Sequence, residues 1–172
     1  AGLRLEDSRS ETKGLYTSHI LTVLPNASLN LHLVSGQQIR FSAGRSLQRP
    51  GIWQLNPSAM LDDPFTISTG NPLLRPEYRT FAWVEYAKKL PVDFFSVRLF
   101  FEDHTDVLNT LMVQGDSTVF GIGWNNLGRI SQAGAQALGT FNLGKSVSIS
   151  PFLKVCYRST TGNDLARLYQ VE

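Results

Sequence analysis

The residues best suited to chemistry are clustered at Glu102, His104 and Asp106. Carboxylate and imidazole groups are common ligands of divalent metals. Alternate residues of a β-strand share a face, so these three side chains could converge. They could equally form a solvated loop at the end of a hairpin, which is the interpretation we favour. The cluster therefore gives no reason to expect a metal or another cofactor.

The other chemical candidates are weaker. His19 and His32 lie far apart in the sequence and have no partner at ligand spacing. Gly144-Lys145-Ser146 ends as a phosphate loop does, but a strand pattern follows it where that motif needs a helix. The single Cys156 excludes a disulfide framework and a multi-cysteine zinc site. No catalytic constellation is present, and we expect the chain not to be an enzyme.

Most of the chain alternates apolar and polar residues, which predicts β-strands. The expected strands cover 1–6, 19–33, 39–47, 78–88, 95–102, 107–113, 119–143 (interrupted at 123–128), 147–158 and 165–172. Residues 7–14 are expected to form a loop, and Pro25 a bulge or bend. One apolar face is expected to hold Val84, Tyr86, Phe95, Val97, Leu99, Phe101, Ile149, Leu153 and Val155.

One long connection, Arg49 to Glu77, separates two of these strands. It holds five of the chain's eight prolines, a spacing that predicts an ordered loop without helix or central strand. Strands 39–47 and 78–88 are expected to pair across it as antiparallel neighbours. Connections of this length without regular structure are usually functional.

Short and long connections alternate along the chain. Those at Gly36, Lys89 and Gly144 are short, and those between them are long. Transmembrane barrels show this asymmetry, with short turns at one rim and long loops at the other. The polar face would then line a lumen with Arg4, His32, Arg40, Arg98 and Lys154, with Glu6, Glu85 and Glu102 as counter-charges. Aromatic residues near the strand ends, with Lys88 and Lys89 beside Tyr86, suit the membrane interfaces.

Composition excludes other classes. The 16 basic and 14 acidic residues are spread evenly and give a formal net charge of +2, which does not favour a nucleic-acid surface. No stretch approaches the ~18 apolar residues of a spanning helix. That excludes a helical membrane protein and leaves a β-barrel open.

The long connection also resembles a known family. Its motif residues are Arg49, Pro50, Leu55, Asn56, Pro57, Asp63, Pro64, Gly70, Asn71, Pro72, Pro76 and Glu77. They are similar to an extracellular-loop signature of the outer-membrane β-barrel family that forms the barrel of Bacteroidetes-type TonB-dependent receptors. Ser58 departs from the aromatic residue usual there. The resemblance spans about residues 1–158.

The resemblance implies an all-β fold: an antiparallel up-and-down meander of about eight strands, forming part of a transmembrane barrel wall in the outer membrane of a Gram-negative bacterium. The implied function is energised uptake of a bulky nutrient. The implied partners are outer-membrane lipid, a TonB-type energy-coupling protein acting through a plug domain, and a surface lipoprotein. No nucleic-acid partner is implied. A small plugless barrel (porin or adhesin) and a soluble β-sandwich binding module remain alternatives.

We expect residues 1–172 to be a partial barrel domain without a plug or the C-terminal barrel strands. The first and last alternating segments, 1–8 and 165–172, each leave a sheet edge. Joining them would close a narrow barrel with a crowded, charged lumen. We therefore expect an open, curved sheet in which these two segments are not paired.

Overall fold

The computed structural model describes residues 1–12, 16–114, 120–144 and 146–162. These residues form β-strands and one short helix. The elements are β1 (Gly2–Thr12), β2 (Tyr16–His32), β3 (Gln37–Gln48), α1 (Ile52–Leu55), β4 (Met60–Asp63), β5 (Thr66–Thr69), β6 (Glu77–Lys89), β7 (Phe94–Thr105), β8 (Leu108–Gln114), β9 (Phe120–Asn126), β10 (Arg129–Leu143), β11 (Val147–Ile149) and β12 (Phe152–Thr161).

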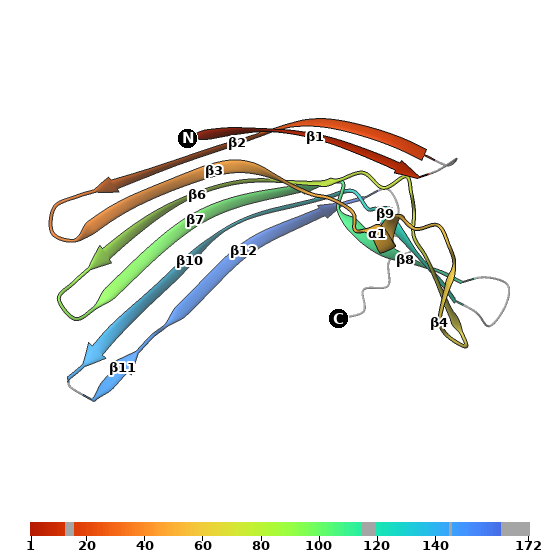
Figure 1. Cartoon of the computed structure of the whole chain (residues 1–172). Helices are drawn as coiled ribbons and strands as arrows, with labels where there is room; N and C mark the ends of the chain where they lie inside the picture. The colour runs from red at the N-terminus through yellow and green to blue at the C-terminus, as the bar shows by residue number, and fades with distance from the viewer. Residues whose placement is uncertain (13–15, 115–119, 145, 163–172) are drawn as a thin grey trace.

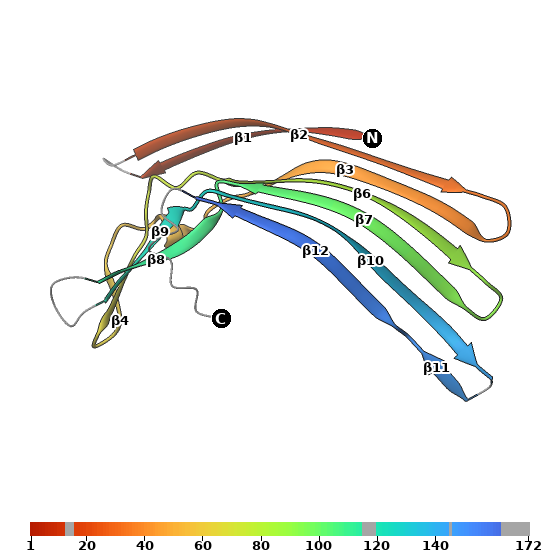
Figure 2. The same cartoon turned by 180° about the vertical axis from the view of Figure 1, so that it is seen from behind.

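Eight strands form one large antiparallel sheet, in the order β1-β2-β3-β6-β7-β10, with β11 and β12 both paired to β10. The sheet is a meander, open and curved when seen from either side (Figure 1; Figure 2). The all-β meander of about eight strands is confirmed. So is the pairing of residues 39–47 with 78–88, because β3 and β6 pair without interruption from Gln37↔Lys88 to Gln48↔Glu77.

The short turns lie together at one end of the sheet, and the long connections lie at the other (Figure 1). In the turn between β2 and β3, the backbone conformation of two residues explains why the turn is short. Ser35 and Gly36 both have positive φ, at 63° and 72°, which suits a tight hairpin turn. A Cβ on Gly36 would also lie 2.5 Å from the carbonyl oxygen of Lys89, so glycine is required there.

The prediction that residues 49–77 contain neither a helix nor a central strand is wrong. One helical turn, α1, lies between Pro50 and Pro57, and the β4–β5 hairpin follows it. The prolines permit both elements because they lie at their boundaries. Pro50 precedes the first helical turn, where a missing amide proton costs no hydrogen bond. Pro64 lies in the hairpin turn, where the side chain of Asp63 accepts a hydrogen bond from the Phe65 amide over 2.8 Å.

The two long connections join each other in a second sheet, ordered β4-β5-β9-β8. Strand β5 from the first connection pairs in parallel with β9 from the second, from Thr66↔Phe120 to Thr69↔Gly123. The segments Leu108–Gln114 (β8) and Phe120–Asn126 (β9) are extended, but they do not belong to the wall. The interruption expected at 123–128 is wrong for residues 123–126, because β9 continues to Asn126. Gly128, with a φ of 88°, turns the chain back into β10 of the large sheet.

The N-terminal hairpin is longer than expected. Residues 7–12 are strand, because β1 pairs with β2 from Gly2↔Asn26 to Thr12↔Tyr16, so the loop expected there is wrong within the described residues. Pro25 pairs with Leu3 without a register shift, so the ladder shows no bulge there, and the β2–β3 ladder ends at Asn26.

The described strands β1 and β12 lie at opposite edges of the sheet, and no ladder joins them. The segment 165–172, expected to be the last strand, lies outside the described residues.

Candidate functional site

The register of the large sheet sorts its side chains onto two faces, because directly opposed residues of antiparallel strands share a face. Val84 lies opposite Leu99, which lies opposite Ala135, which lies opposite Val155. The same ladders place all the residues expected on one apolar face together: Val84, Tyr86, Phe95, Val97, Leu99, Phe101, Ile149, Leu153 and Val155. We call this the outer face and the opposite one the inner face.

The outer face is apolar and exposed, and the inner face buries charge. On the outer face, 55% of Leu99 and 64% of Val155 are exposed. On the inner face, only 3% of Glu85 is exposed. Among the described residues the buried positions are Leu24, Leu74 and Ala87, and the polar Thr22, Ser42, Glu85, Ser96 and Asp103. This polarity is the reverse of a water-soluble domain. It argues against the β-sandwich alternative, in which a second layer would cover the apolar face.

The apolar band of the outer face has two different borders. Near the short turns, Tyr86 and Phe95 form an aromatic pair with ring centroids 5.9 Å apart, next to Lys88. Near the long connections, Asp103 accepts hydrogen bonds from Arg129 Nε and Ser131 Oγ, both at 2.6 Å.

On β6 the two borders lie at Lys88 and Thr80, eight residues apart. That spacing is about 27 Å along a strand. At a tilt of about 40° it gives a height of about 20 Å, comparable to the apolar band of about 25 Å in transmembrane barrels.

Charged residues form the centre of the inner face. Arg40, Glu85 and Arg98 lie opposite one another on β3, β6 and β7. Arg98 donates to Oε2 of Glu85 from Nε at 2.8 Å and from Nη2 at 2.5 Å, and Nη2 of Arg40 lies 2.5 Å from Oε1. The Arg98 guanidinium also lies 4.4 Å from the ring centroid of Trp83. One buried carboxylate is thus held between two cations.

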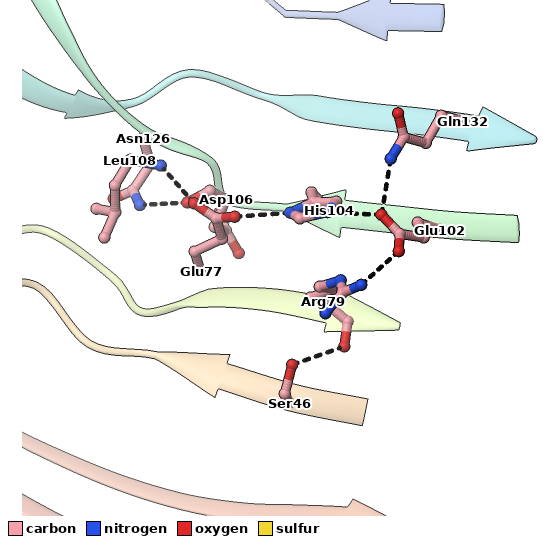
Figure 3. A network of polar contacts seen from close by, with 9 residues as sticks. All are labelled: Ser46, Glu77, Arg79, Glu102, His104, Asp106, Leu108, Asn126 and Gln132. Atoms are coloured by element: carbon pink, nitrogen blue, oxygen red, sulfur yellow. Dashed lines mark hydrogen bonds and ion pairs between the residues drawn. The ribbon is translucent and has the colours of Figure 1, made fainter. Parts of the chain in front are cut away.

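A second polar network lies closer to the long connections (Figure 3). His104 Nδ1 lies 2.8 Å from Oε1 of Glu77, whose Oε2 accepts a hydrogen bond from the Leu108 amide over 3.1 Å. Glu102 accepts hydrogen bonds from Arg79 and, over 2.7 Å, from Gln132. The network ties β6, β7 and β10 together and reaches the start of β8.

The structure brings together only part of the metal-ligand cluster considered above. Glu102 and His104 share the inner face, with 3.9 Å between Glu102 Oε2 and His104 Nε2. Asp106 leaves the strand, because its φ is 55°, and it pairs with Arg75 over 2.7 Å. Within the described part of the chain, no group of three or more histidine, cysteine, aspartate or glutamate side chains could hold a metal ion.

The residues of the loop motif mostly fix the loop's own shape. Arg49 forms an ion pair with Glu6 on β1 over 2.5 Å. The amide of Gly70 donates to the carbonyl of Asn56 over 2.9 Å, and the amide of Asn71 to that of Gln54 over 2.6 Å. A Cβ on Gly70 would meet the carbonyl oxygens of Asn56 and Trp53, so α1 and the end of the hairpin can close on each other only at a glycine.

Hydrogen bonds of the Asn126 side chain join the two long connections. Its Oδ1 accepts from the Arg75 amide, and its Nδ2 donates to the carbonyls of Arg75 and Asp106, each over 2.8 Å. The side chain of Asn71 donates to the Trp124 carbonyl over 3.2 Å. Sequence patterns did not single out Asn126, because its partners are backbone groups about 20 and 51 residues away. Alternation marked Arg40, Glu85 and Arg98 as lumen residues but could not show that they meet.

No helix among the described residues is long and apolar enough to cross a bilayer. A family model described as "Outer membrane protein beta-barrel family" matches residues 1–171. No curated protein matches the sequence.

Solved structures show the same fold in much larger chains. The siderophore receptor PirA from Pseudomonas aeruginosa is similar with a TM-score of 0.70 and 16% identity, over 84% of this chain and 30% of that one. A mutant of the ferric enterobactin receptor PfeA from the same organism, in complex with enterobactin, is similar with a TM-score of 0.61 and 15% identity, over 81% of this chain and 23% of that one. The chain thus spans less than a third of each of these receptors.

Proposed function

The chain belongs to the outer membrane protein β-barrel family, and we propose that it acts as a section of the barrel wall of a TonB-dependent receptor for bulky nutrients. Family membership places it in the outer membrane of a Gram-negative bacterium. The observation that carries the proposal is the reversed polarity of the sheet, with Leu99 and Val155 exposed on one face and Glu85 buried on the other. Such a sheet suits a wall between lipid and an aqueous lumen.

The wall's physical task follows from its backbone. Each strand between the two edges of the sheet pairs with a neighbour on both sides. Few backbone amides and carbonyls are therefore left without a hydrogen bond in the hydrocarbon of the membrane. The short turns would face the periplasm and the long connections the outside. The second sheet, β4-β5-β9-β8, would then stand at the extracellular mouth, where an arriving solute first meets the receptor.

The solute class is suggested by the similar structures, which are described as a siderophore receptor and a ferric enterobactin receptor. A metal chelate of this kind is our first candidate, ahead of a glycan fragment or a peptide. Energy would come from a TonB-type protein acting on a plug inside the barrel. A surface lipoprotein as a further partner stays a prediction.

An uptake assay in the native bacterium tests the proposal. Cells with and without the gene would be grown under iron limitation, and accumulation of radiolabelled ferric siderophores would be measured. We expect accumulation that needs the gene and stops when a protonophore collapses the proton-motive force. Entry of small solutes that needs the gene but not the proton-motive force would contradict the proposal and favour a porin.

A further inference from the structure

The central row of the inner face carries more positive than negative charge. From β2 to β12 the row contains Asn30, Arg40, Glu85, Arg98, Gln136 and Lys154, each directly opposite the next. It therefore holds three cations and one carboxylate. At the level of the apolar band, a surplus of charge in a lumen attracts groups of the opposite sign.

The two arginines beside Glu85 are held differently. Arg98 makes two hydrogen bonds to the carboxylate and stacks on Trp83, so its position is fixed. Arg40 approaches the other carboxylate oxygen only through Nη2. Its Nε is buried, yet has no hydrogen-bond partner among the described residues. At the same time 40% of the Arg40 side chain is exposed on the inner face.

Arg98 already neutralises the carboxylate of Glu85. Arg40 therefore has a hydrogen-bond donor, Nε, that Glu85 does not use. Leaving a buried donor without an acceptor is unfavourable, because the group loses its hydrogen bonds to water and gains none in the protein. Arg40 can turn away from Glu85 without leaving that carboxylate unpaired, because Arg98 remains on it. Its Nε and Nη2 could then bind a second carboxylate through two parallel hydrogen bonds, the strongest geometry available to arginine.

We propose that Arg40 is the binding group of a carboxylate site on the inner face, with Glu85 and Arg98 as the support that holds it. The site rests on the proposed function only in that the inner face must line a lumen. The carboxylate could belong to an acidic side chain of a protein segment inside the barrel or to a solute that enters it. The chemistry is the same for both, and two experiments separate them.

The first experiment measures solute binding by the whole protein, purified in detergent micelles. Citrate is titrated by calorimetry at constant ionic strength, with sodium chloride as the reference ion. A solute site predicts saturable citrate binding that weakens at least tenfold in Arg40→Gln. It should stay within twofold in Arg158→Gln, a matched control that removes an inner-face arginine from β12, two rows nearer the long connections.

The second experiment identifies a protein carboxylate. Arg40→Lys is introduced into the whole protein, carbodiimide couples the new amine to any carboxylate in contact, and mass spectrometry locates the product. The link to Glu85 is expected in every case and shows that the wall has folded. A further link to an acidic residue outside the row Asn30–Arg40–Glu85–Arg98–Gln136–Lys154 would identify the partner.

Either result, or both, supports the site. Citrate binding that is absent or does not depend on Arg40, together with Glu85 as the only cross-linked residue, would overturn it. The heat-induced mobility shift of the barrel in gels, measured in the same samples, reports separately whether a barrel is present. A failed site in an intact barrel leaves the proposed function standing.

Discussion

Glu85 and Arg98 are direct partners across the β6–β7 ladder, and Arg98 Nε donates to Glu85 Oε2 over 2.8 Å. One residue away on each strand, Val84 and Leu99 are partners in the same ladder but point to the other face. Glu85 is buried, and 33% of the Arg98 side chain is exposed, whereas 55% of Leu99 is exposed on the other face. This contrast between adjacent positions is the physical signature of a wall with hydrocarbon on one side and water on the other.

A matched pair of substitutions tests that contrast on β2. Leu29 lies on the outer face opposite Phe41, and the adjacent Asn30 lies on the inner face opposite Arg40. Leu29→Arg should destabilise the barrel by about 2–4 kcal/mol, the cost of an arginine at the lipid midplane, and Asn30→Arg by less than about 1 kcal/mol. Urea unfolding in lipid vesicles, followed by the gel mobility of the folded form, measures both. Equal losses would contradict the assignment of faces.

The Glu85–Arg98 pair should be strongly coupled. Removing one partner leaves a buried charge without its main compensation, which costs about 3–5 kcal/mol. A double-mutant cycle with Glu85→Gln and Arg98→Gln should therefore give a coupling free energy well above that of Arg75–Asp106. The latter pair is largely exposed, with 70% of the Arg75 side chain in contact with solvent, and exposed pairs contribute about 0–1 kcal/mol.

This pair also changes one expectation drawn from alternation alone. Alternation alone predicts that Val97→Arg, on the apolar face, reduces the heat-stable barrel seen in gels, whereas Arg98→Val, on the polar face, matters far less. The structure gives Arg98 two hydrogen bonds to a buried carboxylate, so Arg98→Val is a poor control for Val97→Arg.

Comparable coupling free energies in the Glu85–Arg98 and Arg75–Asp106 cycles would show that burial does not strengthen the inner pair.

The wall was predictable because its physics is local. Period-two alternation and the short turns at Gly36, Lys89 and Gly144 are properties of neighbouring residues, and they gave the strands and the shared face of Val84, Leu99 and Val155. Each strand then pairs with the next along the chain or across one long connection.

The second sheet was not predictable in the same way. The parallel pairing of β5 with β9 joins residues more than 50 positions apart, and no local pattern specifies that partner. The five prolines of the connection argued against any helix in it. The four residues Ile52–Leu55 contain no proline, and they form α1. The contacts of Arg40 and Asn126 likewise depend on distant partners.

The hydrogen bonds of the Asn126 side chain should stabilise the contact between the two long connections. In Asn126→Ala, the Arg75 amide loses its acceptor, and the carbonyls of Arg75 and Asp106 lose a donor. We expect amide hydrogen exchange at Arg75 and in β5 to accelerate at least tenfold. Asn125→Ala is the control, since the hydrogen bond of the Asn125 side chain is to the adjacent Asn126 amide. Unchanged exchange in Asn126→Ala would mean that the connections are held by β5–β9 pairing alone.

Contact between the outer face of the sheet and lipid can be measured residue by residue with site-directed spin labelling along β7. With Cys156 replaced by serine, single cysteines at Phe95, Ser96, Val97, Leu99, Phe100 and Phe101 would carry a nitroxide in the whole protein, reconstituted in vesicles. We expect oxygen, which concentrates in lipid, to relax the labels at Phe95, Val97, Leu99 and Phe101 strongly, and those at Ser96 and Phe100 more weakly. Equal relaxation at odd and even positions, or preferential access of a water-soluble nickel chelate to Val97 and Leu99, would contradict a lipid-facing outer face.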